Sequence, residues 1–158
     1  MDKMVNIKSL FNGIYKNRKV LITGHTGFKG SWLCLLLNKL GADIYGYALE
    51  PVTKPSLYKL ANIDRLITSH IGDIKNQKKI DEVITRIQPE IVIHMAAQPL
   101  VGESYKNPIE TYAVNVLGTL NLLEACKKTK SIKVIVNVTS DKCYENKEWN
   151  WAYRENEP

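Results

Sequence analysis

The 158-residue chain is long enough to bury a hydrophobic core within one domain. Its 44% hydrophobic and 24% charged residues are typical of a globular protein, and no apolar run reaches the length of a membrane span. The net charge of +6 comes from scattered lysines rather than from basic residues interleaved with aromatics, so we expect no nucleic-acid partner. Three cysteines and three histidines at irregular spacing predict neither a disulfide framework nor a metal site. The first residues do not form a signal-peptide pattern, and we therefore expect a cytoplasmic protein.

Strand-like and helix-like segments alternate along the chain. Short apolar runs predict buried parallel strands, and apolar residues spaced by three and four predict helices packed on a sheet. In chain order we expect a strand at 19–23, a helix at 28–40, a strand at 42–49, a short helix at 56–63, a strand at 66–74, a helix at 77–87, a strand at 90–97, a long helix from Pro108 to about Lys128 and a strand at 132–140. Gly41 and Pro108 suit a helix end and a helix start, respectively. After Ser140 the composition changes to an aromatic-rich segment, which we interpret as a surface loop.

Five strands that alternate with helices predict an α/β fold, a doubly wound parallel sheet of the Rossmann type with helices on both faces. In such a sheet, ligands bind beyond the carboxyl ends of the strands, where the strand order reverses. The first turn of this kind is the stretch "LITGHTGFKG" at residues 21–30.

Three glycines punctuate this turn at a spacing of G-x-x-G-x-x-G. Gly24 would permit a tight turn, Gly27 would let the backbone approach a pyrophosphate, and Gly30 would let the helix pack closely on the strand. The phosphates would then meet the N–H groups at the helix start. A plain strand-to-helix turn is the alternative, but the strand before it, the helix after it and the further strand–helix units favour a dinucleotide.

Acidic residues near the ends of the second and third strands are candidates for the adenosine. Asp73 could accept a hydrogen bond from the adenine amino group, with the backbone of Ile74 alongside, or it could cap the following helix. An acid at the end of the second strand would hold the ribose. Ala48 and Leu49 occupy the first places where we expect it, so the role of Glu50 stays open.

Five segments carry a family resemblance: "TGHTGFKGSWL", "GDI", "HMAAQPLV", "YAVNVLGT" and "VTSDKCY". In order and spacing they resemble the extended short-chain dehydrogenases/reductases, and within this family the CDP-glucose 4,6-dehydratases, over residues 18–158. "SDKCY" followed by "EWNWAYRENEP" is the most specific part, because related dehydratases of dTDP- and GDP-sugars carry a carboxylate where Lys142 stands. The alternatives are another NAD-dependent sugar-nucleotide dehydratase or epimerase, or a non-catalytic dinucleotide-binding module.

The resemblance implies NAD as the cofactor and CDP-glucose as the substrate, in the formation of dideoxysugars. Asn115 resembles the family's helix asparagine that braces the active-site strand, although a half-buried polar residue without a role is the alternative. Gly102 stands where the family usually has an arginine near the sugar nucleotide. The implied cofactor-binding residues are Gly24, Thr26, Gly27, Phe28, Lys29 and Gly30 around the pyrophosphate, Asp73 and Ile74 at the adenine, Ala96, Ala97 and Gln98 under the ribose and nicotinamide, and Asn115.

The family's reaction oxidises the sugar at C4, eliminates water across C5 and C6, and returns the hydride to C6. It needs a base at C5, an acid at the C6 hydroxyl and a donor that polarises O4. By resemblance, Ser140 would hydrogen-bond the hexose near O4, Asp141 would protonate the departing hydroxyl and Lys142 would act at C5. A cation that orients the substrate is the alternative role for Lys142.

By resemblance, the family's Tyr-x-x-x-Lys pair would follow the "ENEP" stretch, and Tyr153, which has no lysine four positions later, cannot be its tyrosine. We therefore expect residues 1–158 to form the NAD-binding domain, the N-terminal part of the family's full length, without the C-terminal substrate domain. The isolated chain is expected to be inactive, and the full-length form to be a homo-oligomer without a membrane partner.

Overall fold

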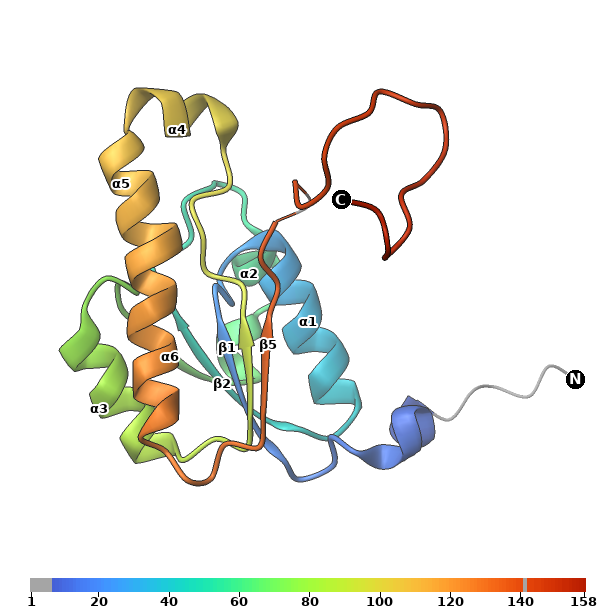
Figure 1. Ribbon diagram of the computed structural model, residues 1–158. Coiled ribbons are helices and arrows are strands. Elements are labelled where there is room, and N and C mark those ends of the chain that lie inside the picture. The colour runs from blue at the N-terminus through green and yellow to red at the C-terminus, as the bar shows by residue number, and fades with distance from the viewer. Residues whose placement is uncertain (1–6, 141) are drawn as a thin grey trace, which may run out of the picture.

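A parallel sheet of five strands forms the centre of the computed structural model, which describes residues 7–140 and 142–158 (Figure 1). The strands lie in the order β3-β2-β1-β4-β5, and every neighbouring pair is parallel. This arrangement confirms the predicted doubly wound sheet. The strands are β1 Lys19–Thr23, β2 Asp43–Ala48, β3 Thr68–Ile71, β4 Ile91–His94 and β5 Val134–Asn137.

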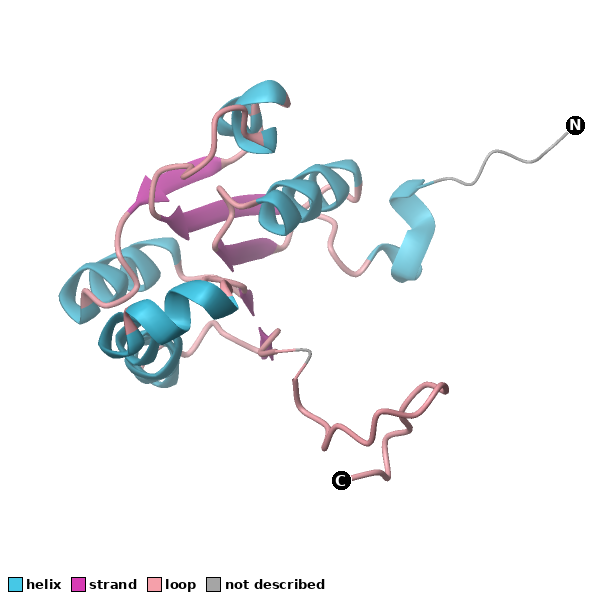
Figure 2. Ribbon diagram, turned by 90° about the horizontal axis from the view of Figure 1, so that it is seen from above, coloured by secondary structure: helices cyan, strands magenta, loops and turns pink. Residues whose placement is uncertain are grey.

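Helices cover both faces of the sheet (Figure 2). The α-helices are α1 Phe28–Lys39, α2 Leu57–Leu60, α3 Gln77–Ile87, α4 Val101–Lys106, α5 Pro108–Tyr112 and α6 Thr119–Lys127. Two 3₁₀ segments lie at Ile7–Gly13 and Ile63–Arg65, and the π-helical segment η3, Ala113–Gly118, joins α5 to α6. Within the described residues, no helix is long and apolar enough to cross a membrane.

The core is divided by the sheet into two halves. Successive residues of a strand point to opposite faces, so Val20 and Ile22 pack with α1 and α2, whereas Leu21 packs with α3 and α6. These three side chains of β1 are fully buried. Complete burial of such a side chain contributes about 1.5–3 kcal/mol to the free energy of unfolding. Strand β1 is therefore the centre of the hydrophobic core.

The structure confirms the predicted elements and changes some of their limits. The helix predicted at 77–87 has these limits in the structure, because Asn76 Oδ1 accepts the Lys79 N–H at its start and Gln88 turns left-handed at its end. The strand predicted at 66–74 spans only Thr68–Ile71, since the chain leaves the sheet beyond Gly72. Helix α4 was not predicted, and its residues are largely exposed.

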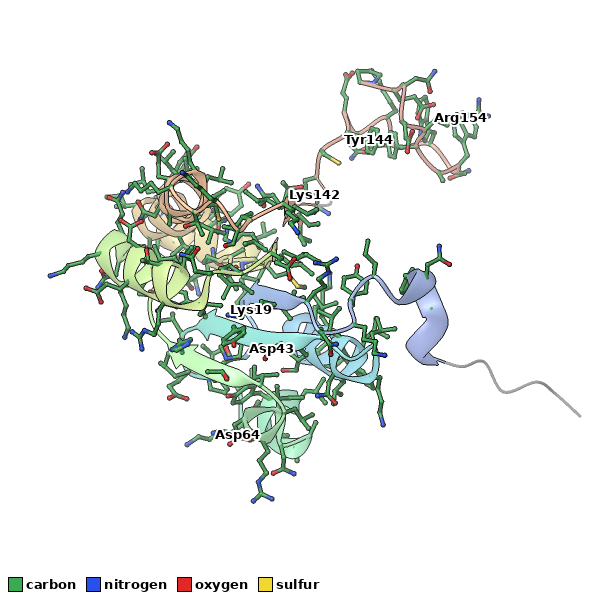
Figure 3. The ribbon with its side chains drawn as sticks, turned by 90° about the horizontal axis from the view of Figure 1, so that it is seen from below. Lys19, Asp43, Asp64, Lys142, Tyr144 and Arg154 are labelled. Atoms are coloured by element: carbon green, nitrogen blue, oxygen red, sulfur yellow. The ribbon has the colours of Figure 1, made fainter. Side chains whose placement is uncertain are left out.

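The edge strand β5 and the segment after it lie outside the packed core. All four residues of β5 are exposed, and residues 142–158 contain neither helix nor strand, which agrees with the predicted surface loop. In this segment the rings of Tyr144 and Tyr153 stack at 5.1 Å, and Trp149 stacks on Trp151 at 5.3 Å. Figure 3 shows Tyr144 and Arg154 far from the strands that carry Lys19 and Asp43.

Candidate functional site

The strand order reverses between β1 and β4. The chain continues from β1 to β2 on one side, then returns past β1 to β4 on the other. The turn after β1 and the loop after β4 consequently open at the same edge of the sheet. This edge is where an open α/β sheet binds its ligand.

Two of the three glycines in the turn are required by the chain itself. Gly24 has φ +76°, and a Cβ there would lie 2.9 Å from the backbone nitrogen of Ala96. A Cβ on Gly30 would overlap the carbonyl oxygen of Gly24, so only glycine lets α1 approach β1 this closely. Both observations confirm the predicted roles of a tight turn and of close helix packing.

Gly27 is different, because the chain does not require a glycine at this position. Its backbone has φ −74° and ψ 169°, an ordinary extended conformation, and an added Cβ would meet only the Gly24 carbonyl oxygen, at 3.4 Å. The N–H groups of residues 28–30 precede the first bond of α1, from Ser31 N to the Gly27 carbonyl at 2.9 Å, and no described side chain caps this end. The cradle therefore fits a pyrophosphate, with N–H groups as donors and space beside Gly27 for close approach.

Thr26, Phe28 and Lys29 complete the turn. The hydroxyl of Thr26 donates to the Leu49 carbonyl at 2.8 Å and so ties the turn to the end of β2. The side chains of Phe28 and Lys29 are exposed. Strand β2 ends at the buried Ala48, and Glu50 is exposed two residues later, so β2 itself ends without a carboxylate.

His25 is a buried residue of the turn that sequence reasoning missed. Its Nε2 lies 2.7 Å from Ser69 Oγ, and its ring packs so closely on β2 that a Cβ at Gly46 would collide with it. Burial lowers the pKa of the His25 imidazole to about 4. The histidine thus anchors the turn to β2 and β3. A glycine inside a strand is the sequence signal for such a close approach.

Asp73 lies beyond β3 in a fixed turn. Its Oδ1 accepts the Lys75 N–H at 2.9 Å, and its Oδ2 is 3.4 Å from Lys75 Nζ. The hydroxyl of Tyr47 donates to the Asp73 carbonyl at 2.9 Å. Asp73 therefore caps a local turn, while Asn76 caps α3. The side chain of Ile74 is buried in the core, which leaves its backbone for the predicted adenine contact.

The loop after β4 contains Ala96, Ala97 and Gln98 and is held by the π-helical segment η3. Asn115 Oδ1 accepts the Gln98 N–H at 2.8 Å, and Asn115 Nδ2 donates to the Gln98 carbonyl at 3.0 Å. This paired contact fixes the backbone at the end of the loop. Asn115 thus supports the predicted nicotinamide side of the site.

The proposed catalytic residues follow β5, at the same edge of the sheet. Val138 N–H donates to the His94 carbonyl at 3.1 Å, which extends the pairing of β5 with β4 towards Ser140. The Ser140 hydroxyl oxygen accepts the Lys142 N–H at 3.0 Å, and both side chains are exposed. Figure 3 shows Lys142 next to the main body of the domain. Asp141 lies outside the described residues.

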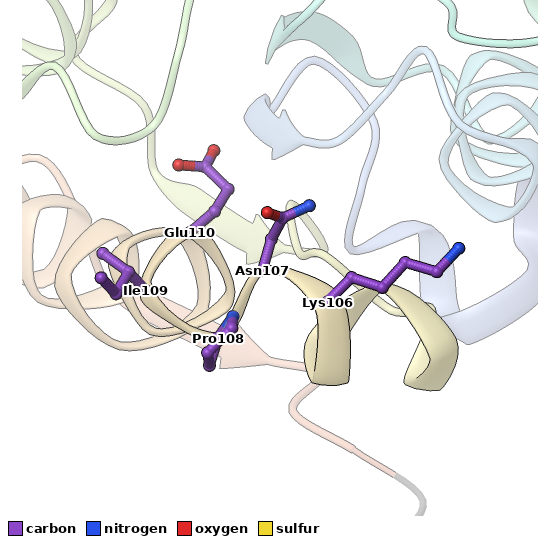
Figure 4. A pocket seen from close by; sticks show the side chains of 5 residues that line it. All are labelled: Lys106, Asn107, Pro108, Ile109 and Glu110. Atoms are coloured by element: carbon purple, nitrogen blue, oxygen red, sulfur yellow. The ribbon is translucent and has the colours of Figure 1, made fainter.

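A shallow hollow of about 320 Å³ lies where α4 meets α5 (Figure 4). Its lining consists of Lys106, Asn107, Pro108, Ile109 and Glu110. None of these residues belongs to the glycine turn, to the loop after β4 or to the segment after β5. Glu110 also pairs with Lys75 Nζ at 2.5 Å, so this hollow lies on the β3 side of the candidate site.

The chain is similar to sugar-nucleotide enzymes over most of its length. The model of the family described as GDP-mannose 4,6 dehydratase matches residues 21–158. A CDP-glucose 4,6-dehydratase of Salmonella typhimurium is 56% identical over 144 residues, which cover 91% of this chain and 40% of that protein. A CDP-paratose 2-epimerase of Salmonella typhi is 33% identical over 88% of this chain and 41% of that protein.

A solved structure gives the same fold. The UDP-glucose 4-epimerase of Brucella ovis in complex with NAD is 33% identical, with a TM-score of 0.62 over 75% of this chain and 35% of that chain. The chain spans 40% and 41% of the length of the two curated relatives above. Since the family model matches residues 21–158, which is most of the sequence, the chain belongs to the GDP-mannose 4,6-dehydratase family.

Proposed function

We propose that the chain binds NAD at the glycine turn and forms the cofactor-binding part of a CDP-glucose 4,6-dehydratase. The observation that carries the proposal is Gly27, whose lack of a side chain is explained neither by the backbone conformation nor by packing. A bound pyrophosphate would explain why this position has no side chain. The 56% identical CDP-glucose 4,6-dehydratase and the solved epimerase with NAD support the choice of substrate and of cofactor.

Each part of NAD has a place along this edge of the sheet. The pyrophosphate would accept hydrogen bonds from the N–H groups of residues 28–30, between Thr26 and the exposed Lys29. The adenine would lie beside Asp73 and the backbone of Ile74. The ribose and nicotinamide would lie over Ala96, Ala97 and Gln98, which Asn115 holds in place.

NAD held at the glycine turn would supply a hydride acceptor for C4 of the sugar and, once reduced, a hydride donor for C6. Ser140 uses its oxygen to accept the Lys142 N–H, which leaves its hydroxyl hydrogen to donate to a sugar oxygen near O4. Asp141 would protonate the departing C6 hydroxyl, and Lys142 would remove the C5 proton or orient the sugar. A positioned acid or base typically contributes about 10²- to 10⁴-fold in rate.

The cofactor assignment is tested by titrating NADH fluorescence with the wild type and with Gly27→Val. We expect the variant to fold and to bind NADH at least about tenfold more weakly, since its side chain fills the space of the pyrophosphate. Gly102→Val is the matched control, because a Cβ at Gly102 meets nothing within 4 Å, and it should bind like the wild type. Equal affinity of Gly27→Val and the wild type for NADH would show that the pyrophosphate does not bind at this turn.

The role of Lys142 is tested in a longer protein that includes the family's remaining length. Lys142→Met should keep NADH affinity, while solvent-deuterium exchange at C5 of the substrate falls by about 10²-fold or more. Lys147→Met, in the same exposed segment, is the control and should leave the exchange unchanged. An unchanged exchange rate in Lys142→Met would assign Lys142 to orienting the sugar.

A further inference from the structure

Buried polar side chains connect the ends of β1 and β4 to the π-helical segment and α6. Thr23 Oγ1 lies 2.6 Å from His94 Nδ1, and His94 Nε2 lies 2.9 Å from Thr119 Oγ1. Thr23 is completely buried and His94 is 4% exposed. Polar groups at such depth are nearly always hydrogen-bonded, so the partners of each atom indicate where its hydrogens lie.

The hydrogen bonds around His94 determine where each hydrogen lies. The Thr119 hydroxyl donates to the Asn115 carbonyl at 2.7 Å, so its oxygen must accept a hydrogen from His94 Nε2. Nδ1 is then the bare nitrogen and accepts from the Thr23 hydroxyl. The Thr23 oxygen in turn accepts the N–H groups of Met95 and Ala96, each at 3.1 Å.

The other forms of the imidazole do not fit this network. A hydrogen on Nδ1 would point at a Thr23 oxygen that already accepts two N–H groups, and the Thr23 hydroxyl hydrogen would lose its acceptor. An imidazolium would have the same conflict and would also carry a buried charge. Burial lowers the pKa of His94, which favours the neutral ring.

The network fixes both ends of the loop after β4. Thr23 binds the N–H groups of Met95 and Ala96 at its start, and the Asn115 side chain binds both backbone groups of Gln98 at its end. Through Thr119 and the Asn115 carbonyl, His94 connects these two anchors. The loop therefore cannot shift without breaking hydrogen bonds on β1, on β4 or on η3.

We propose that His94 is a positioning residue which, as the neutral imidazole with its hydrogen on Nε2, couples the π-helical segment to the loop beneath the nicotinamide. The part of this proposal that concerns the nicotinamide rests on the proposed function, since the position of the loop affects the cofactor only if NAD binds there. The coupling itself is a property of the chain without cofactor. We expect no direct contact between His94 and NAD, because the ring is enclosed by Thr23 and Thr119.

The first test is the ¹⁵N NMR spectrum of the His94 ring in the protein without cofactor, near neutral pH. We expect a protonated Nε2 and a bare Nδ1. A hydrogen on Nδ1, or an imidazolium, would overturn the proposal. This measurement needs no variant and does not depend on whether NAD binds.

The second test is amide hydrogen exchange in His94→Asn, whose side-chain oxygen can replace Nδ1 as the acceptor for Thr23 but whose amide does not reach Thr119. We expect the Gln98 amide to exchange at least about tenfold faster than in the wild type, with the Leu21 and Val92 amides of β1 and β4 unchanged. A uniform acceleration of all amides, or an unchanged Gln98, would reduce His94 to a packing residue. Weak NADH binding by the wild type would instead count against the proposed function, and the exchange result would still stand.

Discussion

Strands β1 and β5 have similar apolar sequences, "KVLIT" and "VIVN", but opposite surroundings. The side chains of Val20, Leu21 and Ile22 are fully buried, because β1 is paired on both sides and covered on both faces. In β5, which among the described residues pairs with β4 alone, Ile135 is 40% exposed and Val136 is 44% exposed. An apolar run thus predicts a strand, whereas its place in the sheet decides how much of it is covered.

The same contrast separates the two halves of the candidate site. The proposed cofactor half, between β1 and β4, is anchored by buried groups such as His25 and His94. The proposed catalytic half follows the exposed β5, and its residues Ser140 and Lys142 are exposed as well. We therefore expect cofactor binding to depend on side chains that are packed inside this chain. The chemistry should depend on groups that lie next to the exposed β5.

The largest predicted effect is on stability, when an isoleucine is truncated to alanine in β1 and in β5. Ile22→Ala in β1 should lower the free energy of unfolding by about 2–5 kcal/mol, because it leaves a cavity in a packed core. Ile135→Ala in β5 removes a half-exposed side chain and should cost at most about 1 kcal/mol. Urea denaturation of both variants measures the difference. Equal losses would mean that β5 is covered in solution.

The buried His25 should make the stability depend on pH. Its pKa is about 4 in the folded chain and 6.5 for the ordinary group, so between these values the unfolded state binds more protons. The contribution of His25 to the free energy of unfolding should therefore be nearly constant above pH 6.5 and fall by up to about 3 kcal/mol on acidification towards pH 4. His25→Gln, which cannot titrate, should show a flatter profile; an unchanged slope would contradict the burial of a neutral ring.

A smaller effect should distinguish the glycines of the turn. Gly30→Ala forces a Cβ against the Gly24 carbonyl oxygen and should cost about 1–3 kcal/mol of stability. Gly27→Ala adds an atom in ordinary contact and should change stability by less than about 0.5 kcal/mol. Thermal unfolding of the two variants compares them. Similar losses would show that Gly27 is needed for folding, and its assignment to the ligand would fail.

Sequence patterns predicted most of the fold because each signal was local. The helix at 77–87 was predicted from its amphipathic period, and its limits agree with the structure, in which Asn76 caps its start. Helix α4 had no comparable signal, since Gly102 lies in its first turn and no described side chain caps its start. The π-helical segment was expected as part of one long helix, because one widened turn does not change the apolar pattern.

Residue spacing alone could predict the part of the site whose residues are neighbours in the sequence, whereas the more distant candidates came mainly from the family resemblance. The glycine turn follows from three glycines between a strand and a helix, and the structure explains Gly24 and Gly30 as expected. The network of Thr23, His94 and Thr119 joins residues that are 71 and 25 positions apart. Each of these residues alone resembles an ordinary polar residue, so this network required the structure.

We propose that NAD lies across the edge of the sheet between β1 and β4. The most direct measurement is a map of backbone amide chemical-shift changes during titration of the ¹⁵N-labelled chain with NAD. We expect the largest changes at residues 24–30, then at 73–74 and 96–98, with small changes along β5. Changes centred on the hollow at residues 106–110, with none at the glycine turn, would show that NAD does not bind between β1 and β4.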